Sequence, residues 1–97
     1  MTTGSNDEPG QDNNMLLKSI QLSSIDEVRK IEEDLAKRTI IILRVTPLAQ
    51  KSIDELKTAV ERLYEFATSI GGDIARLGEE RIVITPPDVR IWRERQP

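Results

Sequence analysis

The chain has 97 residues, with 14 basic and 17 acidic side chains, a formal net charge of −3, no cysteine and no histidine. The length predicts one small domain whose stability would benefit from a partner surface. The missing residue types exclude disulfides, thiolate or imidazole metal sites and catalysis through either side chain, and they favour a cytosolic location. The balanced charge gives no basic footprint for nucleic acid. No apolar run approaches the roughly 20 residues of a membrane-spanning helix.

The first segment, residues 1–14, has polar side chains, glycine and proline, and no large apolar residue after Met1. Such a segment buries too little apolar surface to offset its loss of conformational entropy, so a disordered tail is predicted. A short partner-binding motif is the alternative interpretation. A core domain over residues 15–93 and a frayed C-terminal end over residues 94–97 complete the predicted organisation.

A strand, a helix and a second strand follow the tail. The partial alternation of residues 15–22 predicts the first strand. Ser24 and Glu27 have the spacing of a capping box, which predicts the start of a helix. The aliphatic run of residues 39–45 predicts a central strand that is buried on both faces. Because the chain is too short to cover both faces, this strand predicts a dimer.

Residues 46–51 are predicted to form a loop, and Ser52 with Glu55 marks the start of a second, longer helix. The apolar arc of this helix is wider than contact with one sheet requires. The arc contains Ile53, Leu56, Ala59, Val60, Leu63, Tyr64, Phe66, Ala67 and Ile70. The surplus predicts contact with the same helix of another subunit; alternatively, Phe66 covers the edge of its own domain. Gly71 is predicted to end the helix.

The rest of the chain predicts three short strands. Residues 73–77 and 81–85 form a hairpin around Gly78-Glu79-Glu80, and residues 89–92 form an edge strand after Pro86-Pro87. The predicted fold is therefore α/β (α+β), in the order βαβαβββ. Two helices are predicted to pack on one face of a five-stranded mixed sheet. The other face is left uncovered and is expected to contact a partner.

The sequence contains no catalytic constellation. The carboxylates fall on the solvated faces of helices, and adjacent residues such as Glu32 and Glu33 do not converge. Gly71-Gly72-Asp73 and Gly78 lack the spacing of a phosphate-binding loop. We therefore expect a protein that is not an enzyme and binds no cofactor or metal.

The C-terminal half contains the run Gly72-Asp73-Ile74-x-Arg76-Leu77-Gly78, then Thr85-Pro86, then Val89-x-Ile91. On this run, residues 39–91 resemble the core of the SepF family of cell-division proteins. A weaker likeness extends back to Met15, and archaeal members are the most similar.

The resemblance implies a dimer that can assemble further. It also implies an adaptor that binds the C-terminal tail of the division GTPase FtsZ at the septum. By position, Gly72 matches a family glycine of subunit packing, beside Ala59, Leu63 and Phe66. The tail is expected near the hairpin, where an apolar slot and cations would hold it. The residues assigned to this contact are Arg76, Leu77, Arg81 and Val83.

The N-terminal segment departs from the family pattern. SepF proteins usually begin with an amphipathic membrane helix, whereas residues 1–14 lack the apolar and basic residues of such a helix. Membrane attachment is therefore expected only indirectly, if at all. A second hypothesis is a soluble SepF-like paralogue that binds another protein, or a nucleic acid through the arginines of the C-terminal hairpin. The balance of charge speaks against nucleic acid.

Overall fold

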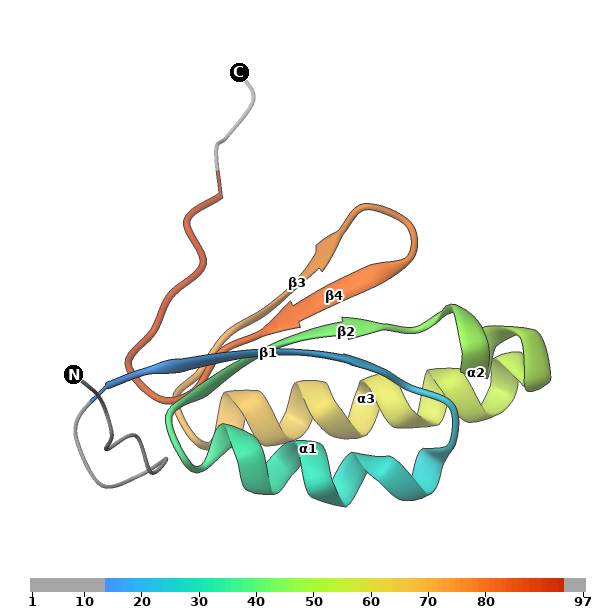
Figure 1. Ribbon diagram of the computed structural model, residues 1–97, viewed down its shortest axis with the longest axis horizontal. Coiled ribbons are helices and arrows are strands. Elements are labelled where there is room, and N and C mark those ends of the chain that lie inside the picture. Colours follow the sequence, from blue (N-terminus) through green and yellow to red (C-terminus); the bar gives the residue numbers. More distant parts are fainter. Residues whose placement is uncertain (1–13, 94–97) are drawn as a thin grey trace, which may run out of the picture.

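The computed structural model describes residues 14–93, which form one layer of strands over one layer of helices (Figure 1). The predicted tail, apart from Asn14, and the predicted frayed end lie outside the described residues.

The sheet has four strands in the order β1-β2-β4-β3. They are β1 (Leu16–Gln21), β2 (Thr39–Arg44), β3 (Ile74–Leu77) and β4 (Arg81–Ile84). The β1 and β2 strands are parallel, as the strand–helix–strand order predicts. The β4 strand runs antiparallel to both β2 and β3, which confirms the predicted hairpin and the mixed sheet.

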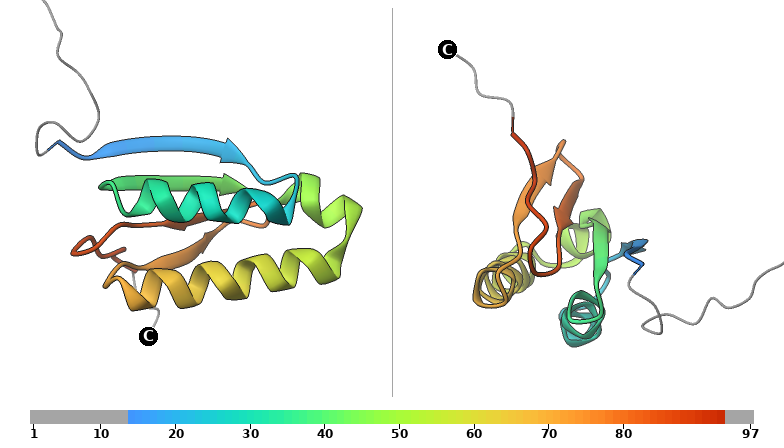
Figure 2. Two further views of the ribbon diagram at one scale, coloured as in Figure 1. Left: turned by 90° about the horizontal axis from the view of Figure 1, so that it is seen from below. Right: turned by 90° about the vertical axis from the view of Figure 1, so that its left-hand side faces the viewer.

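The helical layer covers a single face of the sheet (Figure 2). A 3-10 turn, η1 (Ile25–Glu27), leads into α1 (Val28–Leu35), and a short helix, α2 (Thr46–Lys51), precedes the long α3 (Ile53–Ser69). The core between the layers consists of fully or almost fully buried side chains: Leu22, Val28, Ile31, Leu35, Ile41, Leu43, Leu48, Ala59, Leu63, Ala67, Ile82 and Ile84.

Local signals set the helix boundaries as the sequence predicts. Ser24 Oγ accepts a hydrogen bond from the Asp26 N–H, and the Glu27 carboxylate accepts one from the Ser24 N–H, so the capping box is formed. Ser52 Oγ accepts from the Glu55 N–H at 3.1 Å at the start of α3. Gly71 follows the end of α3 with φ +80°, the left-handed conformation that stops a helix.

The prediction of a loop over residues 46–51 was wrong, because this segment is helix α2. Pro47 stands in its first turn, where a missing N–H is harmless and the fixed φ favours the helix. Leu48 is completely buried and its N–H donates to the carbonyl of Leu22 at 3.0 Å. Packing of Leu48 therefore stabilises a helix too short to be stable alone.

The prediction of a fifth strand over residues 89–92 was also wrong within the described part of the chain. Two backbone groups of this segment bond to side chains, and the Val89 N–H donates to the Pro86 carbonyl within the turn at 3.3 Å. The Val89 carbonyl accepts from Thr85 Oγ1 at 2.7 Å, and the Ile91 N–H donates to Asp73 Oδ2 at 2.9 Å. Asp88, at φ +72°, turns the chain out of an extended course.

The central position of β2 is confirmed, but only one of its faces is fully buried. Thr39, Ile41 and Leu43 face the helices, whereas Ile40 and Ile42 point to the other face and are half-buried. The second face of the sheet is therefore the open one in the protomer.

Candidate functional site

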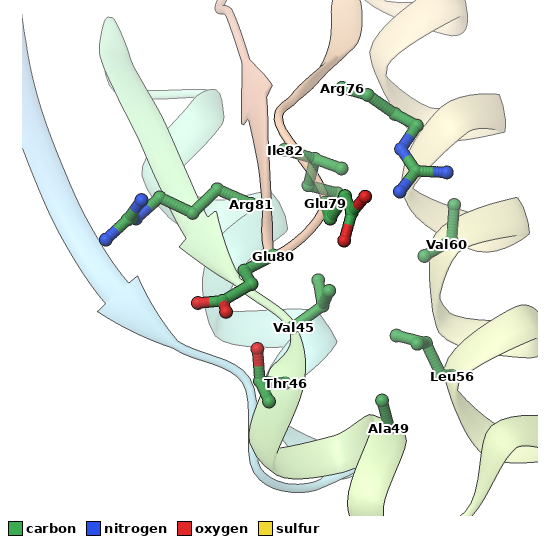
Figure 3. Close-up of a pocket in the computed structure, with 10 residues that line it drawn as sticks. All are labelled: Val45, Thr46, Ala49, Leu56, Val60, Arg76, Glu79, Glu80, Arg81 and Ile82. Atoms are coloured by element: carbon green, nitrogen blue, oxygen red, sulfur yellow. The ribbon is translucent and has the colours of Figure 1, made fainter.

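A groove of about 350 Å³ opens between the β3–β4 turn, α2 and the N-terminal part of α3 (Figure 3). Its lining is apolar at the base and charged at the rim. The apolar lining consists of Val45, Ala49, Leu56, Val60 and Ile82. The charged residues are Arg76, Glu79, Glu80 and Arg81. An apolar slot with a few charged groups at its margin is suited to an extended peptide with apolar anchors.

The turn that forms the rim is attached to the end of β2. The Glu80 carbonyl accepts a hydrogen bond from the Val45 N–H at 2.9 Å. The Glu80 carboxylate also lies 3.4 Å from Arg44 Nη2, a pair at the solvent surface. Gly78 allows the turn by adopting φ +76°. These contacts hold the rim of the groove against the sheet.

The structure divides the four residues predicted to bind the FtsZ tail between two surfaces. Arg76 and Arg81 both line the groove, but Arg76 points toward α3 and Arg81 points away from it (Figure 3). Val83 pairs with Ile42, which lies on the open face of the sheet, and by alternation Arg81 and its hairpin partner Leu77 lie on the same face. Of the four residues, Arg76 is therefore the one that points toward α3, and Leu77 and Val83 lie away from the apolar lining of the groove.

Sequence reasoning missed most of the apolar lining of the groove. Leu56 and Val60 were expected to belong to the core stripe of α3, although both remain partly exposed. Ala49 was placed in a loop, and its position on α2 brings it to the groove. The signal that could have found it is Pro47, which favours the first turn of a helix.

The residues predicted to form the subunit interface pack inside the protomer. Ala59 and Leu63 are fully buried in the core, and Phe66 is partly buried against it. Gly72 lies so close to the backbone of Thr85 that a Cβ at this position would collide with the Thr85 carbonyl oxygen. Ala59 and Leu63 therefore offer no side-chain surface to a second subunit, whereas Phe66 packs partly against its own core and leaves the rest of its side chain exposed.

The open face of the sheet carries a group of apolar side chains. The strand registers place six apolar side chains there, and they are Leu17, Ile40, Ile42, Ala75, Leu77 and Val83. Leu17 is 66% exposed and Leu77 is 48% exposed. A continuous apolar sheet face without a covering layer is typical of a protein–protein interface.

The C-terminal segment is attached to the start of β3 through Asp73. The Asp73 carboxylate pairs with Arg93 Nη2 at 3.2 Å and accepts the N–H groups of Ile74 and Ile91. The Arg93 hydrogen bond, followed by the bond from the Ile91 N–H, lowers the pKa of Asp73 to about 2. Asp73 is therefore a structural anion, and the segment that follows β4 is fixed in place.

The arginines considered for nucleic-acid binding are Arg76, Arg81, Arg90, Arg93 and Arg95, and those within residues 14–93 do not all share one face. Arg76 and Arg81 point to opposite faces of the sheet, and Arg93 is paired with Asp73. Arg95 lies outside the described residues. Within residues 14–93, no group of three or more acidic side chains is placed to hold a metal ion. No helix in the same range is long and apolar enough to cross a membrane.

The groove, the open apolar face and the small two-layer fold define a protein built to bind partners through surfaces. Residues 17–91 match the family described as cell division protein SepF. The chain therefore belongs to the SepF family, as the Gly72–Gly78 run and Thr85-Pro86 predict. A comparison with curated proteins finds no match.

Solved structures of archaeal proteins have the same fold. A SepF-like protein from Pyrococcus furiosus is 30% identical, with a TM-score of 0.75 over 84% of this chain and 99% of that chain. A SepF-like protein from Archaeoglobus fulgidus is 19% identical, with a TM-score of 0.77 over 86% and 99%. Cell division protein SepF from Methanobrevibacter smithii, solved in complex with FtsZ-CTD, is 20% identical, with a TM-score of 0.70 over 80% and 98%.

Proposed function

We propose that this protein is a dimeric, non-enzymatic adaptor of cell division that binds the C-terminal tail of FtsZ. The tail occupies the groove beside the β3–β4 turn, and the protein acts in the cytoplasm at the division site. Membership of the SepF family supports the cellular role. The complex of the Methanobrevibacter smithii protein with FtsZ-CTD supports the choice of partner.

The observation that carries this proposal is the apolar groove whose margin holds two arginines, Arg76 and Arg81, beside Glu79 and Glu80. Leu56, Val60 and Ile82 would contact the apolar anchors of the tail, and Arg76 would pair with an acidic residue inside the groove. Arg81, which points away from α3, would pair with an acidic residue of the tail that extends beyond the groove. The assignment of Leu77 and Val83 moves from the peptide site to the open face of the sheet. There they would contact a second subunit together with Ile42.

A titration with a labelled peptide that copies the FtsZ tail of the same organism tests the proposal. Saturable binding is expected, and Arg76→Glu and Arg81→Glu should each weaken it about tenfold, because an attraction becomes a repulsion. Arg29→Glu is the matched control, since it makes the same charge change on the exposed face of α1. No binding by the folded protein, or an equal loss in the control, would contradict the assignment.

A further inference from the structure

The sheet has two edge strands, β1 and β3, which differ in how far their outer backbone groups are already hydrogen-bonded. An edge strand presents backbone N–H and C=O groups that can pair with an added strand from another chain. Such an edge supports a docking site only where these groups are unoccupied and the flanking side chains suit the incoming segment.

The edge of β3 is already occupied at its first residue. The Ile74 N–H donates to Asp73 Oδ1 at 2.8 Å, and the Ile74 carbonyl accepts from Arg93 Nη2 at 2.8 Å. The strand has only four residues, so these two bonds use much of its free edge. The C-terminal segment therefore protects this edge against strand addition.

Within residues 14–93, no strand pairs with the outer edge of β1. The N–H groups of Leu16 and Leu22 donate to the carbonyls of Arg38 and Arg44, beside β2, at 3.1 and 2.8 Å. Because bonding alternates along a parallel ladder, Leu17, Ser19 and Gln21 direct their N–H and C=O groups outward. All three side chains are exposed, and no other element of residues 14–93 lies beyond β1 (Figure 2).

A groove of about 350 Å³ runs beside this edge, between β1 and the C-terminal part of α1. Three lysines line it, Lys18, Lys30 and Lys37, against a single carboxylate, that of Asp34. Asp34 is almost buried and pairs with Lys18 at 2.9 Å and Lys30 at 3.6 Å. Lys37 has no ion-pair partner among the side chains of residues 14–93. The groove therefore has an excess of positive charge.

We propose that the free edge of β1 is a second docking site, which binds an extended acidic peptide segment as an added strand. In the bound peptide, every second side chain would point to the helix side of the sheet. These side chains would be acidic and would contact the lysines of the groove. Those on the opposite side would be apolar and would extend the surface around Leu17. A second copy of this chain suits the edge poorly, because two β1 edges would bring like-charged lysine grooves together.

A short fluorescent peptide in which glutamate and valine alternate is the probe, and its lysine–valine counterpart is the charge control. We expect saturable binding of the first only. Ser19→Pro should weaken it about tenfold or more, because it removes an outward N–H and places a ring on the edge while leaving the bonds to β2 intact. Ser19→Ala, which keeps the N–H, should bind like the original protein.

The lysine groove is tested by Lys37→Glu, which should also weaken binding about tenfold. Lys57→Glu on the exposed face of α3 makes the same charge change away from this edge and should have no effect. Equal binding of both peptides, or binding unchanged in Ser19→Pro and Lys37→Glu, would overturn the proposal. The proposal would also be overturned if the protein bound no peptide and Ser19→Pro abolished its self-association. The segment that pairs with β1 would then belong to a second copy of this chain.

Amide hydrogen exchange in the unmodified protein provides a test that does not depend on the folding of a variant. The bound peptide should slow exchange at Leu17, Ser19 and Gln21, whereas Lys18 and Ile20, already bonded to β2, should change little. Exchange unchanged at the three outward amides at saturating peptide would contradict strand addition. Arg76→Glu should leave this protection intact, so failure of the FtsZ assignment and failure of this one are distinguishable.

Discussion

Three neighbouring residues hold the point at which α3, β3 and the C-terminal segment meet. Gly72 lies against the backbone of Thr85, and the Asp73 N–H donates to Thr85 Oγ1 at 2.8 Å. The Thr85 N–H returns a bond to the Asp73 carbonyl at 2.9 Å, so the two residues are closely paired. The glycine, aspartate and threonine of the family resemblance therefore have a structural reason within one protomer.

Gly72→Ala should lower the free energy of unfolding by about 2–4 kcal/mol, because the new methyl group collides with a backbone carbonyl that cannot easily move. Gly78→Ala is the control: φ is +76° but the space is open, so a loss of about 1 kcal/mol is expected. Urea unfolding measures both. An effect of Gly72→Ala that disappears at high protein concentration would instead indicate a role between subunits.

Asp73→Asn should weaken the attachment of the C-terminal segment, because it removes the charge and one of the two acceptor oxygens, and it should lower stability at pH 7 by about 1 kcal/mol, with allowance for solvent screening. The pKa of Asp73 is about 2 in the folded protein and about 4 in the unfolded chain, so its contribution is complete above pH 5. It is lost as the pH falls from about 4 to 2. Thermal unfolding across this range should show a smaller decline for the variant. Parallel declines would contradict the assignment.

At the scale of elements, the sequence predicts those that carry their own signals. The α3 helix has a capping serine, an apolar stripe and a glycine stop, and β2 has an aliphatic run. By contrast, α2 depends on the burial of Leu48 under a distant part of the chain. The segment after Pro87 has the spaced apolar residues of a strand in its sequence, but Thr85 and Asp73 bond to the Val89 carbonyl and the Ile91 N–H. Long-range partners of this kind cannot be inferred from local pattern.

The groove was only partly predictable for the same reason. Arg76 and Arg81, which line the groove, were named because the family resemblance places the tail near the hairpin. The apolar lining was missed because it combines residues from α2, α3 and β4, whose arrangement is a tertiary property. Leu77 and Val83 lie on the opposite sheet face from Arg76, because successive side chains of a strand point to opposite faces. Their faces can be assigned only when the strand register is known.

Leu48→Ala should destabilise the protein by about 2–4 kcal/mol, because it leaves a cavity where α2 packs on the core. Ile53→Ala, in the first turn of α3, is a control of similar size at a side chain that is 55% exposed, and it should cost less than about 1 kcal/mol. Urea unfolding separates the two. Equal effects would mean that α2 contributes little to the fold.

At the scale of the whole molecule, the protomer has one covered sheet face and one open face. The helices α1 and α3 cover the first face, and the second carries an apolar surface around Ile42 (Figure 2). The exposed side chains of α3 include two large apolar ones, Tyr64 at 57% and Ile53 at 55% exposure, but these lie eleven positions apart along the helix. The area of apolar surface therefore favours dimerisation through the sheet over dimerisation through α3.

Ile42→Asp tests this choice, and Tyr64→Asp is its counterpart on α3. Two-fold symmetry would bury an unpaired carboxylate from each subunit at a sheet interface, so Ile42→Asp should give a folded monomer. Tyr64→Asp should remain dimeric. Light scattering after size-exclusion chromatography measures the mass, and circular dichroism checks folding. The reverse pattern would assign the interface to α3, and two unaffected dimers would exclude both surfaces. If the protomer pairs through the sheet, the groove beside Arg76 stays accessible on the helix side of both subunits, which would let one dimer bind two tails.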